Sequence, residues 1–321
     1  MWQNGTPVDG FDLSKVSDCI DDPTRLIWAD LTDPSHELLE RLGDELGLSP
    51  WAIEDVVADA ERVKASVYHN HLMLTLYAVR CDTDAADGES GLHLNRISVF
   101  VRGNALITIH RDSFFDMQSV VDRWAEIDMQ RYGIGALLHG LLDVIVDDQF
   151  DAVQTLDEQI ENLETLLFDQ SSRTVSLQRR TYALRKDLVQ LRRVVLPMRE
   201  VIGTIERRRL AGTSPKELDP MWSDLYDHTL RAAEWTESLR DMVTTVFETN
   251  LSLQDARLNT VMKKLTGWAG IIAVPTAITG FFGQNVPYPG YSHVSGFVAS
   301  TVLIIVMMVG LYLVFRRRDW L

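Results

Sequence analysis

A row of side chains between residues 248 and 276 has the composition of an ion pathway. Its spacings are three or four residues, which places every member on one side of a helix. Acids and leucines fill its first half, and small or hydroxyl-bearing residues fill its second half: Glu248, Leu251, Asp255, Leu258, Met262, Leu265, Ala269, Ala273 and Thr276. A water-free, apolar interface between helices would explain the leucines. Carboxylates at one end and a hydroxyl at the other fit a narrow path for cations better.

The chain carries no sign of enzymatic chemistry. It has no phosphate-binding glycine loop, no HExxH motif and no nucleophile motif. Its two cysteines, Cys19 and Cys81, give neither a disulfide framework nor a repeated metal-ligand spacing. We therefore expect a protein that is not an enzyme.

Two uncharged segments near the carboxyl end are long enough to cross a bilayer. Residues 297–315 would span about 28 Å as a helix, close to the thickness of the hydrocarbon core, and residues 265–283 are uncharged as well. Lysines 263–264 precede the first segment and arginines 316–318 follow the second, whereas the loop 286–296 has neither Lys nor Arg. The positive-inside rule predicts a multi-pass protein of the plasma (inner) membrane with both termini in the cytoplasm.

The remainder of the chain is strongly acidic. Of the net charge of −15, the first 260 residues contribute −19, from 26 basic and 45 acidic side chains. Such a body repels nucleic acid, so we expect no nucleic-acid partner. One chain therefore contains a strongly acidic body and a small basic, apolar tail.

The amino-terminal residues predict a mixed α/β domain. Alternating apolar and polar residues indicate two hairpins, one turning near Asn70 and one at Gly103-Asn104. We expect Asp33 or Pro34 to open the first helix. The predicted elements are a strand at 25–31, helices at 34–47 and 49–58, and hairpins at 63–80 and 94–110.

Helical patterns replace strand patterns from about residue 117. Residues 134–168 carry an apolar stripe and many acids, and residues 174–210 form a basic helical stretch, so we expect an antiparallel pair of complementary charge. Asp219 and Pro220 suit the start of a last helix, with no strong breaker before Gly267. An unbroken helix from 220 to 282 is too long for one small domain, which predicts packing against other copies of the chain.

Several motifs give this sequence a specific resemblance. The segments NTVMKKLT (259–266), GFFGQN (280–285) and the ending FRRRDWL resemble the CorA family of divalent-cation channels. Agreement continues upstream in LSPWAIEDVV (48–57) and ERVKASVY (61–68), with spacings intact between motifs. The resemblance implies a funnel-shaped homopentamer in which the first membrane helices line a central pore.

The resemblance divides the chain into six parts and defines an α+β membrane protein. They are a cytosolic α/β domain (1–116), cytosolic antiparallel helices (117–218), a stalk helix continuous with the first membrane helix (219–285), an external loop (286–296), a second membrane helix (297–315) and a basic cytosolic tail (316–321).

The resemblance also assigns roles at the outer mouth of the pore. Gly283, Gln284 and Asn285 stand where the family has its Gly-x-Asn signature, and a ring of Asn285 amides would hold hydrated Mg²⁺ by its waters. The best-known members have Met at the middle position and acids in the outer loop, whereas this chain has Gln284 and no acid there. Gln284 either coordinates the ion or faces solvent.

Further roles follow along the pathway and in the cytosolic part. Thr276 would supply a hydroxyl ring, Met262 and Leu265 a hydrophobic gate, and Ala273 stands where the family narrows its pore with methionine. By motif alignment, Asp55 and Asp224 match carboxylates that bind regulatory Mg²⁺ in this family, and Glu54 lies beside them. Arg316, Arg317 and Arg318 form either a basic collar at the inner mouth or a positive-inside anchor.

Three functions compete. The leading one is influx of Mg²⁺, with Co²⁺ or Ni²⁺ as further substrates, gated by cytosolic Mg²⁺. The second is a Zn²⁺ transporter on the same scaffold, suggested by the altered signature, although only His293 and no cysteine lies near the outer mouth. The third is a membrane-tethered scaffold that conducts nothing, which the polar residues Thr276, Asp255 and Glu248 argue against.

Overall fold

The computed structural model describes most of the chain and divides it into two compact units, Met1–Val246 and Phe247–Leu321. The described residues are 1–3, 6–7, 16–20, 22, 24–82, 89–112, 114–126, 132–168, 174–210, 215–284 and 287–320. The strands are β1 (Trp2–Gln3), β2 (Thr6–Pro7), β3 (Arg25–Thr32), β4 (Lys64–Val67), β5 (Leu72–Cys81), β6 (Leu92–Arg102) and β7 (Ala105–His110). The helices are α1 (Val16–Cys19), α2 (His36–Leu46), α3 (Pro50–Val57), α4 (Met117–Glu126), α5 (Ile134–Phe168), α6 (Thr174–Val195), α7 (Met198–Leu210), the short 3-10 helix η3 (Lys216–Leu218), α8 (Asp219–Phe282) and α9 (Val294–Arg317).

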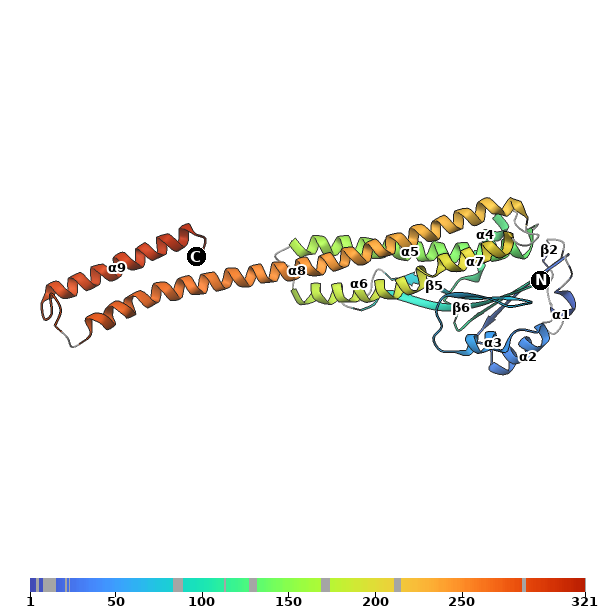
Figure 1. Cartoon of the computed structure of the whole chain (residues 1–321), viewed down its shortest axis with the longest axis horizontal. Coiled ribbons are helices and arrows are strands. Elements are labelled where there is room, and N and C mark those ends of the chain that lie inside the picture. Colours follow the sequence, from blue (N-terminus) through green and yellow to red (C-terminus); the bar gives the residue numbers. More distant parts are fainter. Residues whose placement is uncertain are drawn as a thin grey trace. The chain divides into compact units, whose positions relative to one another are not determined.

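A mixed sheet forms the centre of the first unit, in the order β2-β1-β3-β7-β6-β5-β4 (Figure 1). Strands β3 and β7 are parallel, and the other neighbours are antiparallel. Both predicted hairpins are confirmed as β4-β5 and β6-β7. Gly103, at the second turn, has φ +53, and a Cβ there would lie 2.5 Å from the carbonyl oxygen of Ile20, so only glycine fits this turn.

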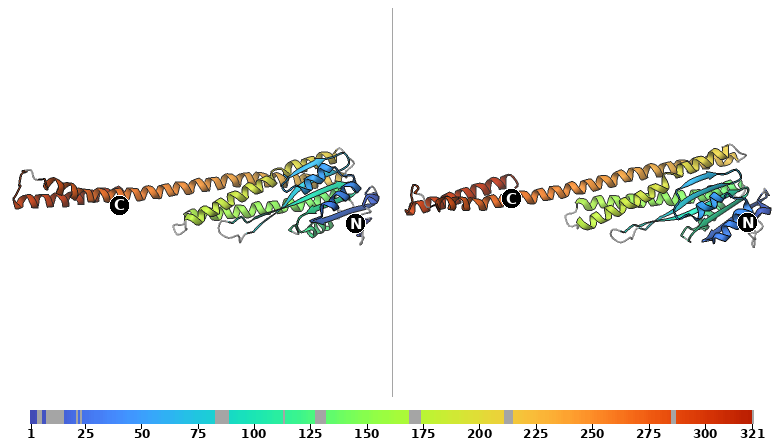
Figure 2. Two further views of the ribbon diagram at one scale, coloured as in Figure 1. Left: turned by 90° about the horizontal axis from the view of Figure 1, so that it is seen from below. Right: turned by 60° about the horizontal axis from the view of Figure 1, so that its bottom comes forward.

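Helices cover both faces of the sheet. Helices α1, α2 and α3 lie on one face, and α5 lies on the other, as Figures 1 and 2 show from three directions. All six residues of β7 are buried in consequence, and they are mostly aliphatic (ALITIH). On the α2–α3 face the core includes Leu39, Leu46, Ile53 and Phe100.

The start of α2 differs from the sequence-based expectation. Ser35 is the N-cap, and its hydroxyl accepts a hydrogen bond from the Leu38 amide at 3.3 Å. The expectation of Asp33 or Pro34 was wrong because Asp33 belongs to the preceding turn, with φ +46 and its N–H donating to the His110 carbonyl. The predicted end is confirmed, since Gly47 closes the helix at φ +55.

The long helices of the first unit follow the predicted ranges with one interruption. Helices α6 and α7 are separate because Pro197 lacks an N–H, and the chain turns at Leu196–Pro197 before α7 begins. The first part of α8 packs on α5 through two edge-to-face aromatic contacts, His139 with Trp222 and Phe150 with Trp235. His139 and Trp222 are buried, Phe150 and Trp235 are partly buried, and together these rings fix the register of the two helices.

The second unit holds the rest of α8 and the whole of α9. As predicted, α8 continues without interruption through Pro275 to Phe282, and α9 covers the second apolar segment. Each contains an apolar window long enough to cross a membrane, and only 11% and 0% of the residues in those windows are buried within the chain. Apolar surface this poorly covered by its own chain requires lipid or neighbouring copies around it.

Candidate ion pathway and metal-binding residues

The row of residues predicted to line an ion pathway lies on one exposed side of α8. Every member, from Glu248 to Thr276, is exposed to solvent in the single chain. The opposite side of the helix turns toward α9: Ile271 is only 4% exposed, and a Cβ on Gly270 would lie 3.5 Å from the ring of Phe315. At 100° per residue the centres of these two sides are about 150° apart. The stripe is therefore free to face other chains.

Two threonines near the end of α8 satisfy their hydroxyl protons within the helix. Thr276 donates to the Ile272 carbonyl at 3.3 Å, and Thr279 donates to the Pro275 carbonyl at 2.8 Å. Each hydroxyl oxygen keeps lone pairs that can accept from the water shell of a cation. Thr276 belongs to the predicted stripe and Thr279 does not, although both are exposed.

The Gly-x-Asn signature follows the end of α8. The Gly283 amide donates to the Thr279 carbonyl at 2.8 Å and continues the helical hydrogen bonding for one residue, and both Gly283 and Gln284 are exposed. A Cβ on Gly283 would lie 2.9 Å from the Thr279 carbonyl oxygen, so the glycine permits this close turn. Asn285 and Val286 lie outside the described residues.

Aromatic rings hold the described part of the external loop against the end of α8. The ring of Tyr288 packs edge-to-face on Phe282 at 5.0 Å and on Tyr291 at 5.4 Å. Gly290 has φ +94, and a Cβ on Gly296 would lie 2.5 Å from its carbonyl oxygen. The loop therefore folds back tightly on the first turn of α9.

Asp55 lies on α3 in a small ion-pair group. Its carboxylate is 2.9 Å from Nζ of Lys64, which is also 2.8 Å from the Glu61 carboxylate. Burial acts to lower the pKa of Lys64, but hydrogen bonds to Glu61 and Asp55 outweigh it and raise that pKa. A metal ion at Asp55 must therefore compete with a fully protonated lysine. Glu54, the neighbouring residue, is exposed.

Asp224 lies on α8, among residues that the sequence did not single out. It is 70% exposed and 3.8 Å from His228. The α5 residues His139 and Asp143 interact electrostatically with this group: burial lowers the pKa of His139 and raises that of Asp143, and His228 and Asp224 act on them. These partners could be found only from the packing of α5 on α8, because about 80 residues separate them.

The two predicted regulatory carboxylates are not brought together within one chain. Asp55 lies on α3, against one face of the sheet, whereas Asp224 lies on α8, which packs on the helices of the other face (Figure 1). Within the described part of the chain, no group of three or more His, Cys, Asp or Glu side chains is arranged to hold a metal ion. A site that uses both carboxylates needs a second copy of the chain.

Comparison with known proteins decides the family. A family model described as "CorA-like Mg2+ transporter protein" matches residues 24–317. The chain belongs to the CorA family.

Relatives agree over nearly the whole length. The cobalt/magnesium transport protein CorA of Thermotoga maritima is 27% identical over 92% of this chain and 83% of that protein, and the CorA of Methanocaldococcus jannaschii is 28% identical over 92% of both. The complete structure of the CorA magnesium transporter from Methanocaldococcus jannaschii matches with a TM-score of 0.74, covering 94% of this chain and 93% of that one. This CorA-family chain is a membrane transporter of divalent cations.

The basic end of this CorA-family chain is built into the last turn of α9. Arg316 and Arg317 are in the helix and Arg318 caps it, with its N–H donating to the carbonyls of Val314 and Phe315. The ring of Trp320 stacks on Phe315 with centroids 5.4 Å apart. All three arginines are exposed, a placement open to both predicted roles, collar and anchor.

The acidic helix α5 gives this CorA-family chain a pH-dependent stability. Burial, with smaller effects of Asp151 and Asp147, raises the pKa of Asp148 to about 6. The folded state therefore holds this proton more tightly than the unfolded state, in which the pKa is near 3.9. The stabilisation is complete below about pH 4 and is lost as the pH rises through about 6.

We expect Asp148→Asn to stabilise the protein at neutral pH. Two pKa units correspond to about 2.7 kcal/mol, which solvent screening at this half-buried position reduces to about 1 kcal/mol. The midpoint of thermal unfolding in metal-free detergent solution should rise by about 2–4 °C at pH 7.5 and should not change at pH 4. Glu158→Gln, an exposed acid on the same helix, is the control. An Asp148→Asn midpoint equal to wild type at pH 7.5 would contradict the assignment.

Proposed function

We propose that this chain forms a homopentameric channel for passive influx of Mg²⁺, with Co²⁺ and Ni²⁺ as further substrates. Five α8 helices surround the ion path, and α9 lies outside them in contact with lipid. The pore opens at the external loop, and both termini are in the cytoplasm of the cell that bears it.

The observation that carries this proposal is the exposed stripe on α8, which lies opposite the side that meets α9. A helix with one side packed on its own chain and the other side exposed, polar and small can line a pore between subunits. A scaffold that conducts nothing would gain from an unbroken apolar stripe. Carboxylates of Glu248 and Asp255 would instead be costly in a dry seam.

The proposal assigns the order of contacts along the path. Gly283, Gln284 and Asn285 form the selectivity filter, with Asn285 amides binding the water shell of Mg²⁺. Thr276 and then Ala273 follow. The small side chain of Ala273 leaves a wider passage than a larger side chain would. Leu258, Met262, Leu265 and Ala269 form a hydrophobic stretch that closes by excluding water. Asp255 and Glu248 concentrate cations at the inner end.

The proposal also places regulation at subunit interfaces. Asp55, with Glu54, would meet Asp224 of a neighbouring copy and share a Mg²⁺ ion. The exposure of Asp224, at 70%, and the separation of α3 from α8 within one chain support this arrangement. Hard-cation sites need paired carboxylates, and paired carboxylates repel when the ion leaves.

Ion flux into liposomes tests the proposal and separates it from Zn²⁺ transport. Purified protein should admit Mg²⁺ down its gradient without an imposed pH gradient, and Co²⁺ and Ni²⁺ should pass as well. Flux of Zn²⁺ alone would replace the proposal by the Zn²⁺ transporter, and flux of none of the four ions would favour a scaffold. Protein-free liposomes provide the baseline.

Thr276→Val should reduce Mg²⁺ flux about three- to tenfold, because the ring of hydroxyls loses weak contacts with the water shell worth about 1 kcal/mol in total while the side chain keeps its shape. Thr279→Val is the matched control, since Thr279 makes the same kind of hydrogen bond within the helix but lies off the stripe. Equal flux in the two variants would argue that Thr276 does not face the pore.

A further inference from the structure

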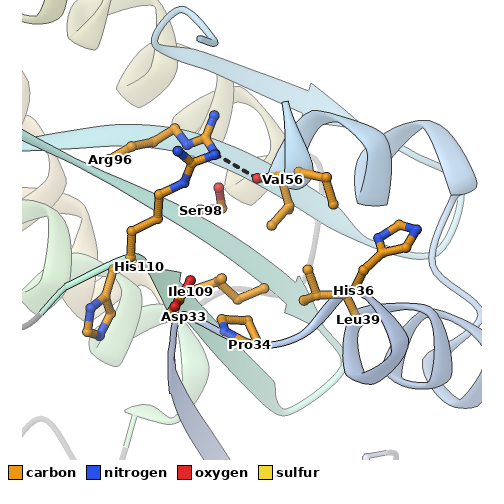
Figure 3. Close-up of a pocket in the computed structure, with 11 residues that line it drawn as sticks. Asp33, Pro34, His36, Leu39, Val56, Arg96, Ser98, Ile109 and His110 are labelled. Carbon is orange, nitrogen blue, oxygen red and sulfur yellow. Dashed lines mark hydrogen bonds between the residues drawn. The ribbon is translucent and has the colours of Figure 1, made fainter. Parts of the chain in front are cut away.

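A cavity of about 260 Å³ opens at one end of the sheet in the first unit (Figure 3). It lies between the amino end of α2, the carboxyl end of α3 and the strands β6 and β7. Leu39, Val56 and Ile109 form apolar walls, and Arg96, Arg111 and Ser98 contribute polar groups. Nothing in the proposed ion path uses this cavity.

Arg96 contributes a positive charge, fixed in position by hydrogen bonds, to this cavity. The residue is half-buried, and its guanidinium donates to the carbonyl of Val56 at 2.6 Å, as Figure 3 shows. It also donates to the carbonyl of Ala58 at 2.5 Å, just after the end of α3. These carbonyls carry a partial negative charge of about half a unit. Among the described residues no carboxylate pairs with Arg96, so a substantial part of its charge is uncompensated.

A second positive charge and one negative charge border the cavity. Arg111 is 58% exposed and pairs with Asp59, which is 97% exposed, so water weakens this ion pair. Among the described lining residues Asp33 is the one carboxylate. The side chain of His110 points to the opposite face of the sheet from Ile109, where it contacts Asp30, and it adds no charge to the cavity. The described lining residues thus hold two guanidinium groups and one carboxylate, in a chain of net charge −15.

The floor of the cavity holds a hydroxyl without a partner. Ser98 is 2% exposed, lines the cavity, and makes no side-chain hydrogen bond within the described part of the chain. Thr75, directly opposite Ser98 in the β5–β6 register, is 1% exposed and its hydroxyl also lacks a partner there. The Ser98 hydroxyl is therefore free to donate to a ligand in the cavity, whereas Thr75 lies outside the lining.

We propose that this cavity binds a small oxyanion, a phosphate group or the carboxylates of a small organic acid. The oxyanion would accept hydrogen bonds from Ser98 and from the guanidinium of Arg111, in the positive potential of Arg96 and the amino end of α2. The cavity volume is large enough for the oxyanion group and a few further non-hydrogen atoms of the same molecule. The proposal concerns binding only and does not depend on the transport activity.

Calorimetric titration of the full chain in detergent tests the proposal. Inorganic phosphate and citrate are titrated separately into metal-free protein at constant ionic strength, so that neither acts by removing Mg²⁺. We expect one of them to bind at one site per chain with a Kd below about 1 mM, and the arm that saturates identifies the kind of oxyanion. The backbone amides of residues 36 and 37 should then exchange hydrogen more slowly. The absence of saturation by either probe below about 10 mM overturns the proposal.

Variants locate the binding site. Arg111→Gln and Ser98→Ala should each weaken binding about tenfold, the factor expected for one hydrogen bond to a charged group. Arg80→Gln is the matched control, since Arg80 is equally exposed at 59% and also pairs with an exposed aspartate, Asp82. Arg96 is left unchanged because it also caps α3. Unchanged binding in both Arg111→Gln and Ser98→Ala, or an equal loss in Arg80→Gln, would place the oxyanion elsewhere and overturn the proposal.

Discussion

Asn285→Ala is expected to abolish selective Mg²⁺ influx while leaving the assembly intact. In the proposed pentamer five amides are lost at once, each worth about 0.5–1 kcal/mol. The combined loss of about 2.5–5 kcal/mol corresponds to a decrease of roughly 10²-fold or more in occupancy of the outer mouth. The measurement is Mg²⁺ flux into liposomes, with native mass spectrometry to show that the oligomer persists.

Gln284→Ala is the matched comparison, because it removes the same amide group one position earlier. If Asn285 holds the ion and Gln284 faces solvent, only Asn285→Ala loses flux. Loss of flux in both variants would indicate that both amides contact the ion. Wild-type flux in Asn285→Ala would refute the assignment of Asn285 to the filter.

The double substitution Asp55→Ala with Asp224→Ala is expected to remove the control of the channel by cytosolic Mg²⁺. The first 260 residues of each subunit carry −19, so five copies repel one another when divalent ions are scarce. Mg²⁺ shared between Asp55 and Asp224 of adjacent subunits would offset this repulsion and favour the closed state. In the double variant, millimolar Mg²⁺ should neither reduce the current nor protect the cytosolic part from proteolysis.

The control for the double variant removes two other exposed carboxylates, Asp44 on α2 and Asp241 on α8. It changes the net charge equally, so general repulsion alone predicts the same result in both variants. Retention of the wild-type Mg²⁺ dependence by Asp55→Ala with Asp224→Ala would mean that the regulatory site lies elsewhere. In the double variant Lys64 loses its ion pair with Asp55 and keeps its ion pair with Glu61.

The sequence contained enough to predict the elements of this fold. Alternation over 63–80 and 94–110 is a local property, and both segments are hairpins. The absence of charge over 265–283 and 297–315 is equally local, and both segments are apolar helices. The motifs at 259–266 and 280–285 pointed to the family that the comparisons establish.

Local competition caused the smaller errors. Asp33, Pro34 and Ser35 are all residue types that can begin a helix. The Asp33 N–H donates a hydrogen bond to the His110 carbonyl, which keeps Asp33 in the preceding turn and leaves Ser35 as the N-cap. Residues 174–210 were predicted as one basic helical stretch, and the break between α6 and α7 follows from Pro197.

The candidate sites could also be predicted only in part from the sequence. The stripe on α8 could be predicted because helical periodicity alone puts its members on one side, but only the packing of Ile271 and Gly270 near α9 showed that this side is free. Asp55 pairs with Lys64 on β4, and Asp224 interacts electrostatically with His139 on α5. Their proximity depends on sheet register and helix packing.

The sequence by itself determined the type and order of the elements, the two membrane segments, the acidic body and the family, because each is written in local periodicity, charge or short motifs. Only the tertiary structure decided which hydroxyls lack hydrogen-bond partners, as at Ser98 and Thr75, and which carboxylates stand apart within a chain, as Asp55 and Asp224 do. The physical reason is that hydrogen bonds, ion pairs and cavities join residues far apart in the chain, and their geometry is set by how sheet and helices pack.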